Sequence, residues 1–194
     1  MALTTTCDNL LSANIGYDCA DPVVKGLRAM GYLCNYDDVD KDAVEITDNV
    51  ISSFALKSGK KAYRIAVPNT TPFNGTKTSM VAGTYRNTFD KTVQFVILDN
   101  GKDVTGKIID KLANGKFVAI LENEYSKGGD NAFEVYGYEQ GLKASALEND
   151  KYSADTEGGW MVTMTETQAP RSGIYFLSDD IEQTRSALEA MVTA

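Results

Sequence analysis

The strongest constraint on the fold is the strand periodicity in the second half of the chain. Residues 91–100, KTVQFVILDN, alternate so that Val93, Phe95 and Ile97 share one face of a strand. Residues 116–125, KFVAILENEY, are apolar on both faces, a pattern typical of a central strand. These two segments predict a mainly β domain.

A third strand is expected over residues 158–168, GGWMVTMTETQ. One face carries Trp160, Val162 and Met164, and the other carries Met161, Thr163 and Thr165. This alternation indicates a strand with one buried face.

Two helices accompany the strands. The first, over residues 101–115, has an apolar side chain at every fourth position: Val104, Ile108 and Leu112. Asp103 is its expected N-cap, and Gly115 is placed for a left-handed C-terminal cap. The fold class is therefore mainly β, a β-sandwich or barrel with one short internal helix and a C-terminal helix.

The C-terminal helix is expected within SDDIEQTRSALEAMVTA. Ser178 is its expected cap, and acidic residues fill its first turn. Ile181, Leu188 and Met191 line one side, so this side should pack on the sheet.

The length of 194 residues suits a single domain. Residues 1–50 mix glycine, proline and acidic clusters with short apolar runs, which predicts an N-terminal arm and short strands packed on the core. Residues 51–194 should form the sandwich or barrel core with the C-terminal helix. Within this core, a hairpin turning at Ser58-Gly59 is expected over residues 51–67.

Residues 68–79, PNTTPFNGTKTS, predict a long polar loop because they hold two prolines, an Asn-Gly and many hydroxyl side chains. Ordered loops of this length are usually functional. Its apolar members, with Met80 just beyond, are difficult to bury within the same domain, which predicts a contact with a neighbouring copy. The expected self-assembly residues are Pro68, Phe73, Asn74, Lys77 and Met80.

The segment NAFEVYGYEQGL, residues 131–142, raises a second interface hypothesis. As a strand it would place Phe133, Val135 and Gly137 on one face, and Glu134, Tyr136 and Tyr138 on the other. The second face is both aromatic and polar. Tyrosine is favoured at interfaces because it buries a large area and keeps a polar end. This face is therefore a candidate subunit interface, although a helix packed on it would explain the tyrosines equally well.

Composition argues against catalysis. The chain has no histidine, which removes the commonest general base and the Ser-His and Cys-His nucleophile pairs. Glu122 with Glu124 or Glu134 could form a glycosidase pair, but glutamates on strands are normally solvated. We therefore expect no enzyme activity, no catalytic residue and no cofactor.

The charge of −8 disfavours binding to phosphate backbones. Asp38, Asp40 and Asp42 have the spacing of a calcium loop, but Ala43 and Asn49 replace the glycine and glutamate that such a loop requires. A solvated acidic loop is the expected interpretation, with no metal site.

Cys7, Cys19 and Cys34 lack disulfide or zinc spacing, so reduced thiols are expected. The sequence contains no run of about 18 apolar residues and no secretory signal, so neither a membrane partner nor export is expected.

The order of elements resembles that of structural proteins from phages and prophages of Bacteroides and related bacteria. The likeness rests on a strand ending in ILDN, a short amphipathic helix, LANGKFVAILENEY, a hairpin into FEVYGYEQGL, and GGWMVTMT. It covers roughly residues 50–168. Within that group, the order is most similar to a tail tube (major tail) protein.

The resemblance implies a tail-tube-like sandwich or barrel with a flanking helix. Six copies would join edge to edge into a ring, and rings would stack into a tube through a long loop and the terminal arms. The implied partners are the chain itself, a tape-measure protein and other tail or head-completion proteins, with DNA only as passing cargo. The implied location is the virion, assembled in the cytoplasm of the host bacterium.

Two alternatives stay open. The N-terminal CDNLLSANIGYDC and the C-terminal helix depart from the simplest tube subunits, so a capsid-decorating protein, a connector or another virion role is the first. The second is a small-ligand or carbohydrate-binding β module in which Trp160 and tyrosines line a cleft.

Overall fold

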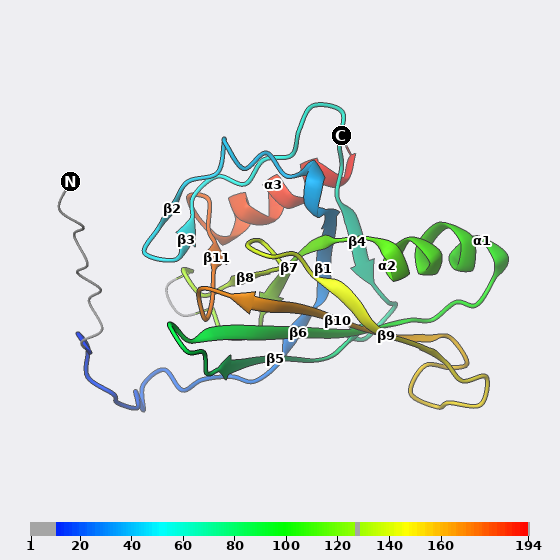
Figure 1. The fold of residues 1–194 in the computed structure, drawn as a ribbon, viewed down its shortest axis with the longest axis horizontal. Helices are drawn as coiled ribbons and strands as arrows, with labels where there is room; N and C mark the ends of the chain where they lie inside the picture. The colour runs from blue at the N-terminus through cyan, green and yellow to red at the C-terminus, as the bar shows by residue number, and fades with distance from the viewer. Residues whose placement is uncertain (1–10, 127–128, 194) are drawn as a thin grey trace.

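The computed structural model describes residues 11–126 and 129–193 and shows a mainly β fold. A seven-stranded sheet packs face to face on a four-stranded sheet, and one long helix covers the other face of the larger sheet (Figure 1). The predicted mainly β class with an internal and a C-terminal helix is confirmed, and the β layers form a sandwich.

The seven-stranded sheet has the order β2-β3-β11-β8-β7-β1-β4. Adjacent strands in this sheet are antiparallel, except that β11 and β3 are parallel to each other. The strands are β1 (Leu27–Asn35), β2 (Ile46–Thr47), β3 (Val50–Ile51), β4 (Tyr63–Ala66), β7 (Phe117–Asn123), β8 (Phe133–Tyr136) and β11 (Tyr175–Phe176). As predicted, β7 is an interior strand and is apolar on both faces, since it is covered by the second sheet on one side and by the helix on the other.

The four-stranded sheet has the order β5-β6-β10-β9 and is antiparallel throughout. Its strands are β5 (Phe73–Val81), β6 (Thr88–Ile97), β9 (Lys143–Asn149) and β10 (Trp160–Ala169). The predicted alternation is confirmed, because Val93, Phe95, Val162 and Met164 point into the core between the sheets.

The internal helical segment consists of α1 (Lys102–Val104), a π-helical turn η2 (Thr105–Ile109) and α2 (Asp110–Asn114). The wider π turn changes which side chains face the protein: Ile109 is buried, whereas Ile108, predicted on the packed side, is exposed. The caps also differ from the prediction. Gly101 occupies the N-cap position in place of Asp103, and Gly115 is extended rather than left-handed.

Helix α3 (Ile181–Thr193) packs on the larger sheet through its predicted apolar side. Leu188 is fully buried, with Ile181 and Met191 beside it. The cap is Asp180 rather than Ser178, since the Asp180 carboxylate accepts the Gln183 N–H at 2.7 Å. A short 3₁₀ turn, η1 (Tyr36–Asp38), completes the helical elements of the described residues.

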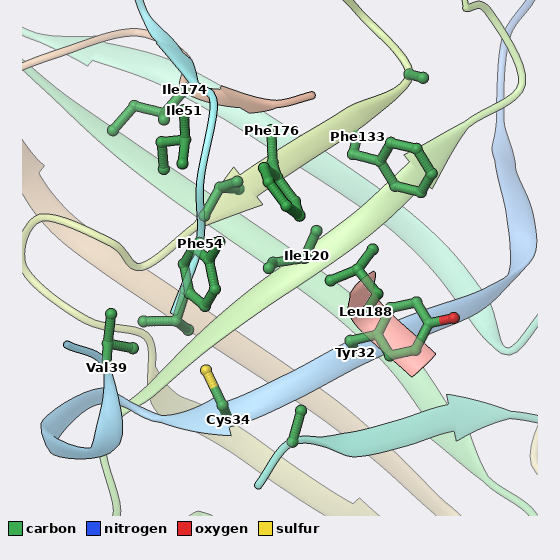
Figure 2. Close-up of a cluster of buried hydrophobic side chains, with 14 residues drawn as sticks. Tyr32, Cys34, Val39, Ile51, Phe54, Ile120, Phe133, Ile174, Phe176 and Leu188 are labelled. Carbon is green, nitrogen blue, oxygen red and sulfur yellow. The ribbon is translucent and has the colours of Figure 1, made fainter. Parts of the chain in front are cut away.

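Two apolar cores lie on opposite faces of the seven-stranded sheet. Figure 2 shows the core beneath α3, where Phe54 and Phe176 meet with ring centroids 5.9 Å apart and Leu188 lies beside Tyr32. Two cores on one sheet explain why β1 and β7 bury side chains on both faces.

The assignment of residues 1–50 to an arm with short strands packed on the core needs correction. Residues 11–26 contain no helix or strand and extend from the body as an arm (Figure 1). However, β1 has nine residues and lies inside the sheet, hydrogen-bonded to β7 and β4. A boundary at residue 50 would therefore remove a core strand.

The predicted hairpin over residues 51–67 is wrong. A turn does exist at Ser58-Gly59, where Gly59 has φ +74°. However, β3 and β4 lie near opposite edges of the larger sheet and do not pair with each other. The local turn signal was correct, but the strand partners are distant in sequence.

Candidate functional site

The predicted self-assembly loop is largely a strand. Residues 73–81 form β5, paired with β6 along its length, so the loop prediction is wrong for them. Phe73 is buried between the sheets and cannot be an exposed loop tip. Pro68 lies in a tight turn closed by the Val67–Thr70 bridge. Replacing this segment by a short turn would remove a core strand.

The remaining members of this set lie on the surface of β5. Asn74 and Lys77 are exposed, and Met80 is 59% exposed. Because β5 is the first strand of its sheet, these residues border an unpaired edge. The surface role predicted for them is therefore compatible with an edge strand rather than a loop.

The predicted interface face of Glu134, Tyr136 and Tyr138 is not a single surface. Tyr136 is 2% exposed and belongs to the core between the sheets. Gly137 follows with φ +81°, which ends the strand, and Tyr138 then packs toward the core beneath α3. The interface prediction is wrong because the face meets the protein's own second sheet.

Glu134 is held within this inner layer. The Tyr136 hydroxyl donates to Glu134 Oε2 at 2.6 Å. Burial raises the pKa of the Glu134 carboxyl above its ordinary value, while the Tyr136 hydrogen bond and the Lys91 charge act in the opposite direction. Burial is also the main cause that raises the pKa of Tyr136. The pair is therefore polar, paired and interior.

A buried ion pair lies beside it. The side chains of Lys91 and Glu166 are 1% and 0% exposed, with Lys91 Nζ 3.8 Å from Glu166 Oε2. Glu166 also accepts three backbone N–H groups: Gly137 at 3.0 Å, Glu139 at 3.1 Å and Gln140 at 2.7 Å. The carboxylate thus fixes the turn after β8. Because both charges are closed off from solvent, this pair is a structural element rather than a site open to a substrate.

Sequence reasoning missed this pair, although a signal was present. Lys91 is two residues before the buried Val93, and Glu166 is two residues after the buried Met164. Since alternate residues share a face, both charges had to point into the core. A charged side chain on the buried face of a strand requires a partner of opposite charge or a set of hydrogen bonds.

In the described part of the chain, the four-stranded sheet leaves two edges without a further strand partner, and α2 packs against β9. Within the described residues, β5 pairs only with β6 and β9 only with β10 among the strands. The centre of the outer face between these edges is polar, with cross-strand pairs of Thr92 with Thr165 and Gln94 with Thr163. Unpaired edges expose backbone donors and acceptors that can pair with another chain. The two edges are therefore the best candidate functional surface.

The two ends of this sheet are also exposed. At the β5–β6 turn, Tyr85 is 99% exposed next to Arg86; at the β9–β10 connection, Tyr152 is 97% exposed. The second connection also carries Asp155 and Glu157. The strand pairings place these turns at opposite ends of β6 and β10, as Figure 1 shows. One end is thus basic and aromatic, and the other acidic and aromatic.

The N-terminal arm exposes apolar side chains. Leu11, Ile15, Tyr17, Val23 and Val24 are between 53% and 91% exposed. At its base, a groove of about 580 Å³ lies against the start of β5, and its polar lining includes Asn74, Asn123, Asn131, Tyr125 and Tyr175. Trp160, expected to line a ligand cleft, is not part of this groove.

Asp38 does not form a cation site with Asp40 and Asp42. Its carboxylate accepts the Asn35 amide at 2.7 Å and pairs with Lys60 at 3.0 Å, and both contacts lower its pKa. No group of metal-ligating side chains is found in residues 11–126 and 129–193.

Cys19 and Cys34 are free thiols, as expected, and Cys7 lies outside the described residues. In the part of the chain that the structure describes, no helix is long and apolar enough to cross a bilayer.

Comparisons with protein-family models, with curated proteins and with solved structures give no match to this chain.

Proposed function

We propose that the chain is a bacteriophage structural subunit that self-associates edge to edge into rings, which stack into a tail tube that conducts DNA. The resemblance over roughly residues 50–168 supplies this hypothesis and the expectation of six copies per ring. The tube would surround a tape-measure protein and contact other tail or head-completion proteins.

The observation that carries the proposal is the four-stranded antiparallel sheet with two open edges. Because its strand number is even, its edge strands β5 and β9 run antiparallel to each other. Copies related by rotation about an axis along the strands would then bring β9 of one copy antiparallel to β5 of the next. Edge pairing would continue the same ladder from copy to copy and close it, which removes both edges of this sheet.

The outer face of this sheet suits the lining of a DNA conduit. Its centre consists of hydroxyl and amide side chains, including Thr92, Gln94, Thr163 and Thr165. Such groups hold phosphates weakly compared with a row of arginines. The overall charge of −8 adds repulsion, so DNA would slide rather than bind.

The two ends of the sheet suit stacking. Arg86 and Tyr85 at one end complement Asp155, Glu157 and Tyr152 at the other. Such a contact joins different surfaces of two copies and repeats without closing, which generates a filament of rings. The exposed apolar side chains of the arm would be covered by a neighbouring copy.

The test is the assembly state of the purified protein at high concentration, measured by light scattering after size exclusion and by negative-stain microscopy. We expect rings and tubes. A protein that stays monomeric in both measurements would refute the proposal. Closed rings that never stack would instead favour the connector alternative.

A proline scan of β5 tests the edge. Thr76→Pro and Lys77→Pro are made separately, because neighbouring residues of a strand point their N–H groups in opposite directions. The proline whose N–H points to solvent should keep the fold by circular dichroism and abolish rings. Thr76→Val and Lys77→Arg, which keep both N–H groups and the positive charge at position 77, are the matched controls and should assemble. Rings in both proline variants would exclude β5 as the pairing edge.

A further inference from the structure

Closure of the proposed ring restricts the register between copies. Barrel strands tilt by about 35–45°, and tilt and stagger are linked. In a barrel of eight strands with a shear of eight, the strands tilt by about 36°. The same ratio of shear to strand number, applied to the four strands that each copy contributes, gives a stagger of about four residues between neighbouring copies. Because side chains alternate between faces, only an even stagger keeps the outer face continuous. A stagger of two residues would correspond to a strand tilt of about 20°, and a stagger of six residues to about 48°, and both tilts lie outside the usual range.

The paired strands show which residues lie at one level of the outer face. Lys77 is opposite Thr92, Thr92 is opposite Thr165, and Thr165 is opposite Lys143. Lys77 and Lys143 therefore mark the same level on the two open edges. Without a stagger, Lys143 of one copy would face Lys77 of the next, and like charges directly opposite each other destabilise a ladder.

A stagger of four residues replaces this repulsion by attraction. Glu148 is opposite Met161, which is opposite Val96, four residues along β6 from Thr92. Shifting the neighbouring copy by four residues in this direction places its Lys77 opposite Glu148. The shift in the other direction would carry β5 beyond the end of β9, with no overlap left to pair.

We infer that β9 of one copy pairs with β5 of the next in the register that sets Glu148 opposite Lys77 and Lys143 opposite Val81. The partner is a second copy of this chain, and the inference rests on the proposed ring. Both charged side chains are exposed on the isolated chain and lie on the outer face of the sheet. The contact would place an opposite-charge pair at every boundary between copies.

Disulfide trapping reads the register directly. In a background with Cys7→Ser, Cys19→Ser and Cys34→Ala, one variant carries Lys77→Cys with Glu148→Cys. The matched control carries Lys77→Cys with Lys143→Cys. Directly opposite residues have Cα atoms about 4.5–5.5 Å apart, within reach of a disulfide. Mild oxidation of the first variant should give a ladder of cross-linked species that ends at the closed ring, and the control should stay uncross-linked.

Charge reversal supplies an independent measurement on the native cysteine background. Lys77→Glu and Glu148→Lys should each weaken ring formation at least tenfold at low salt, and the double exchange should restore it. Lys61→Glu and Glu45→Lys, at exposed positions away from both edges, are the matched controls and should leave assembly unchanged.

The outcomes separate the two proposals. Cross-linking of the Lys143→Cys variant in place of the Glu148→Cys variant, or a double exchange that fails to recover, would overturn the register and leave the ring intact. An absence of rings in the wild-type protein would overturn the proposed function together with the register.

Discussion

The buried pair of Lys91 and Glu166 gives the sharpest stability prediction. Removing one member of a buried ion pair typically costs about 3–5 kcal/mol, because the remaining charge is left uncompensated. In Lys91→Met, the Glu166 carboxylate keeps its three backbone N–H donors. The loss of unfolding free energy in this variant should therefore be at the lower end of that range, about 3 kcal/mol.

Glu166→Gln should cost more, for a reason visible in the geometry. Oε1 accepts two N–H groups, from Glu139 and Gln140, and a glutamine carbonyl can keep both. Oε2 accepts the Gly137 N–H, and the amide group that replaces it would oppose that donor. An orphaned buried donor costs a further 1–3 kcal/mol or so. The ammonium of Lys91 would also lose its ion-pair partner and would keep the Glu134 carboxyl as a nearby acidic group.

The double variant provides the discriminating result. Lys91→Met with Glu166→Gln removes both charges, and neutral replacement of a buried pair is often close to neutral in stability. The double variant should therefore be more stable than Glu166→Gln alone. Urea unfolding of dilute protein, followed by the fluorescence of the single tryptophan Trp160, measures the unfolding free energy of the two single variants and of the double variant. The reasoning would be refuted if the double variant lost as much unfolding free energy as the two single variants together, or if each single variant lost less than about 1 kcal/mol.

Four further predictions follow from other parts of the molecule. Burial raises the pKa of Glu134 above 4.5, so its ionised form destabilises the fold at neutral pH. Glu134→Gln should therefore raise the urea midpoint at pH 7, and this gain should fade as the pH falls through the raised pKa and be absent below about 4.5. Gly137→Ala should cost about 1–3 kcal/mol in urea unfolding, because φ is +81° and the added Cβ would lie 2.5 Å from the Phe117 carbonyl oxygen; an unchanged midpoint would contradict this. Arg86→Glu should yield rings without long tubes by negative stain, and tubes of normal length would exclude this end as the stacking surface. Deleting residues 1–22 should leave the melting temperature of the monomer nearly unchanged, since residues 11–20 are exposed, but should weaken assembly in sedimentation.

The sequence by itself determined the elements whose signal is local. Val93, Phe95, Val162 and Met164 alternate with polar residues, and this pattern already selects the buried face of β6 and β10. The apolar side of α3 was readable for the same reason, because a helical period needs no knowledge of the partner. Both signals express a preference of the segment itself for one buried face.

Tertiary structure decided which segments pair and what each face meets. Residues 73–81 carry Asn-Gly, two threonines and a serine, which suggested a loop, yet β6 supplies a full ladder and makes them a strand. Tyr136 looked like an interface residue, but the second sheet covers it. Strand partners such as β1 and β7 are separated by more than eighty residues, and no local preference encodes that distance. The open edges of β5 and β9 are likewise a property of the assembled sheet, since an edge exists only once the other strands have taken their places.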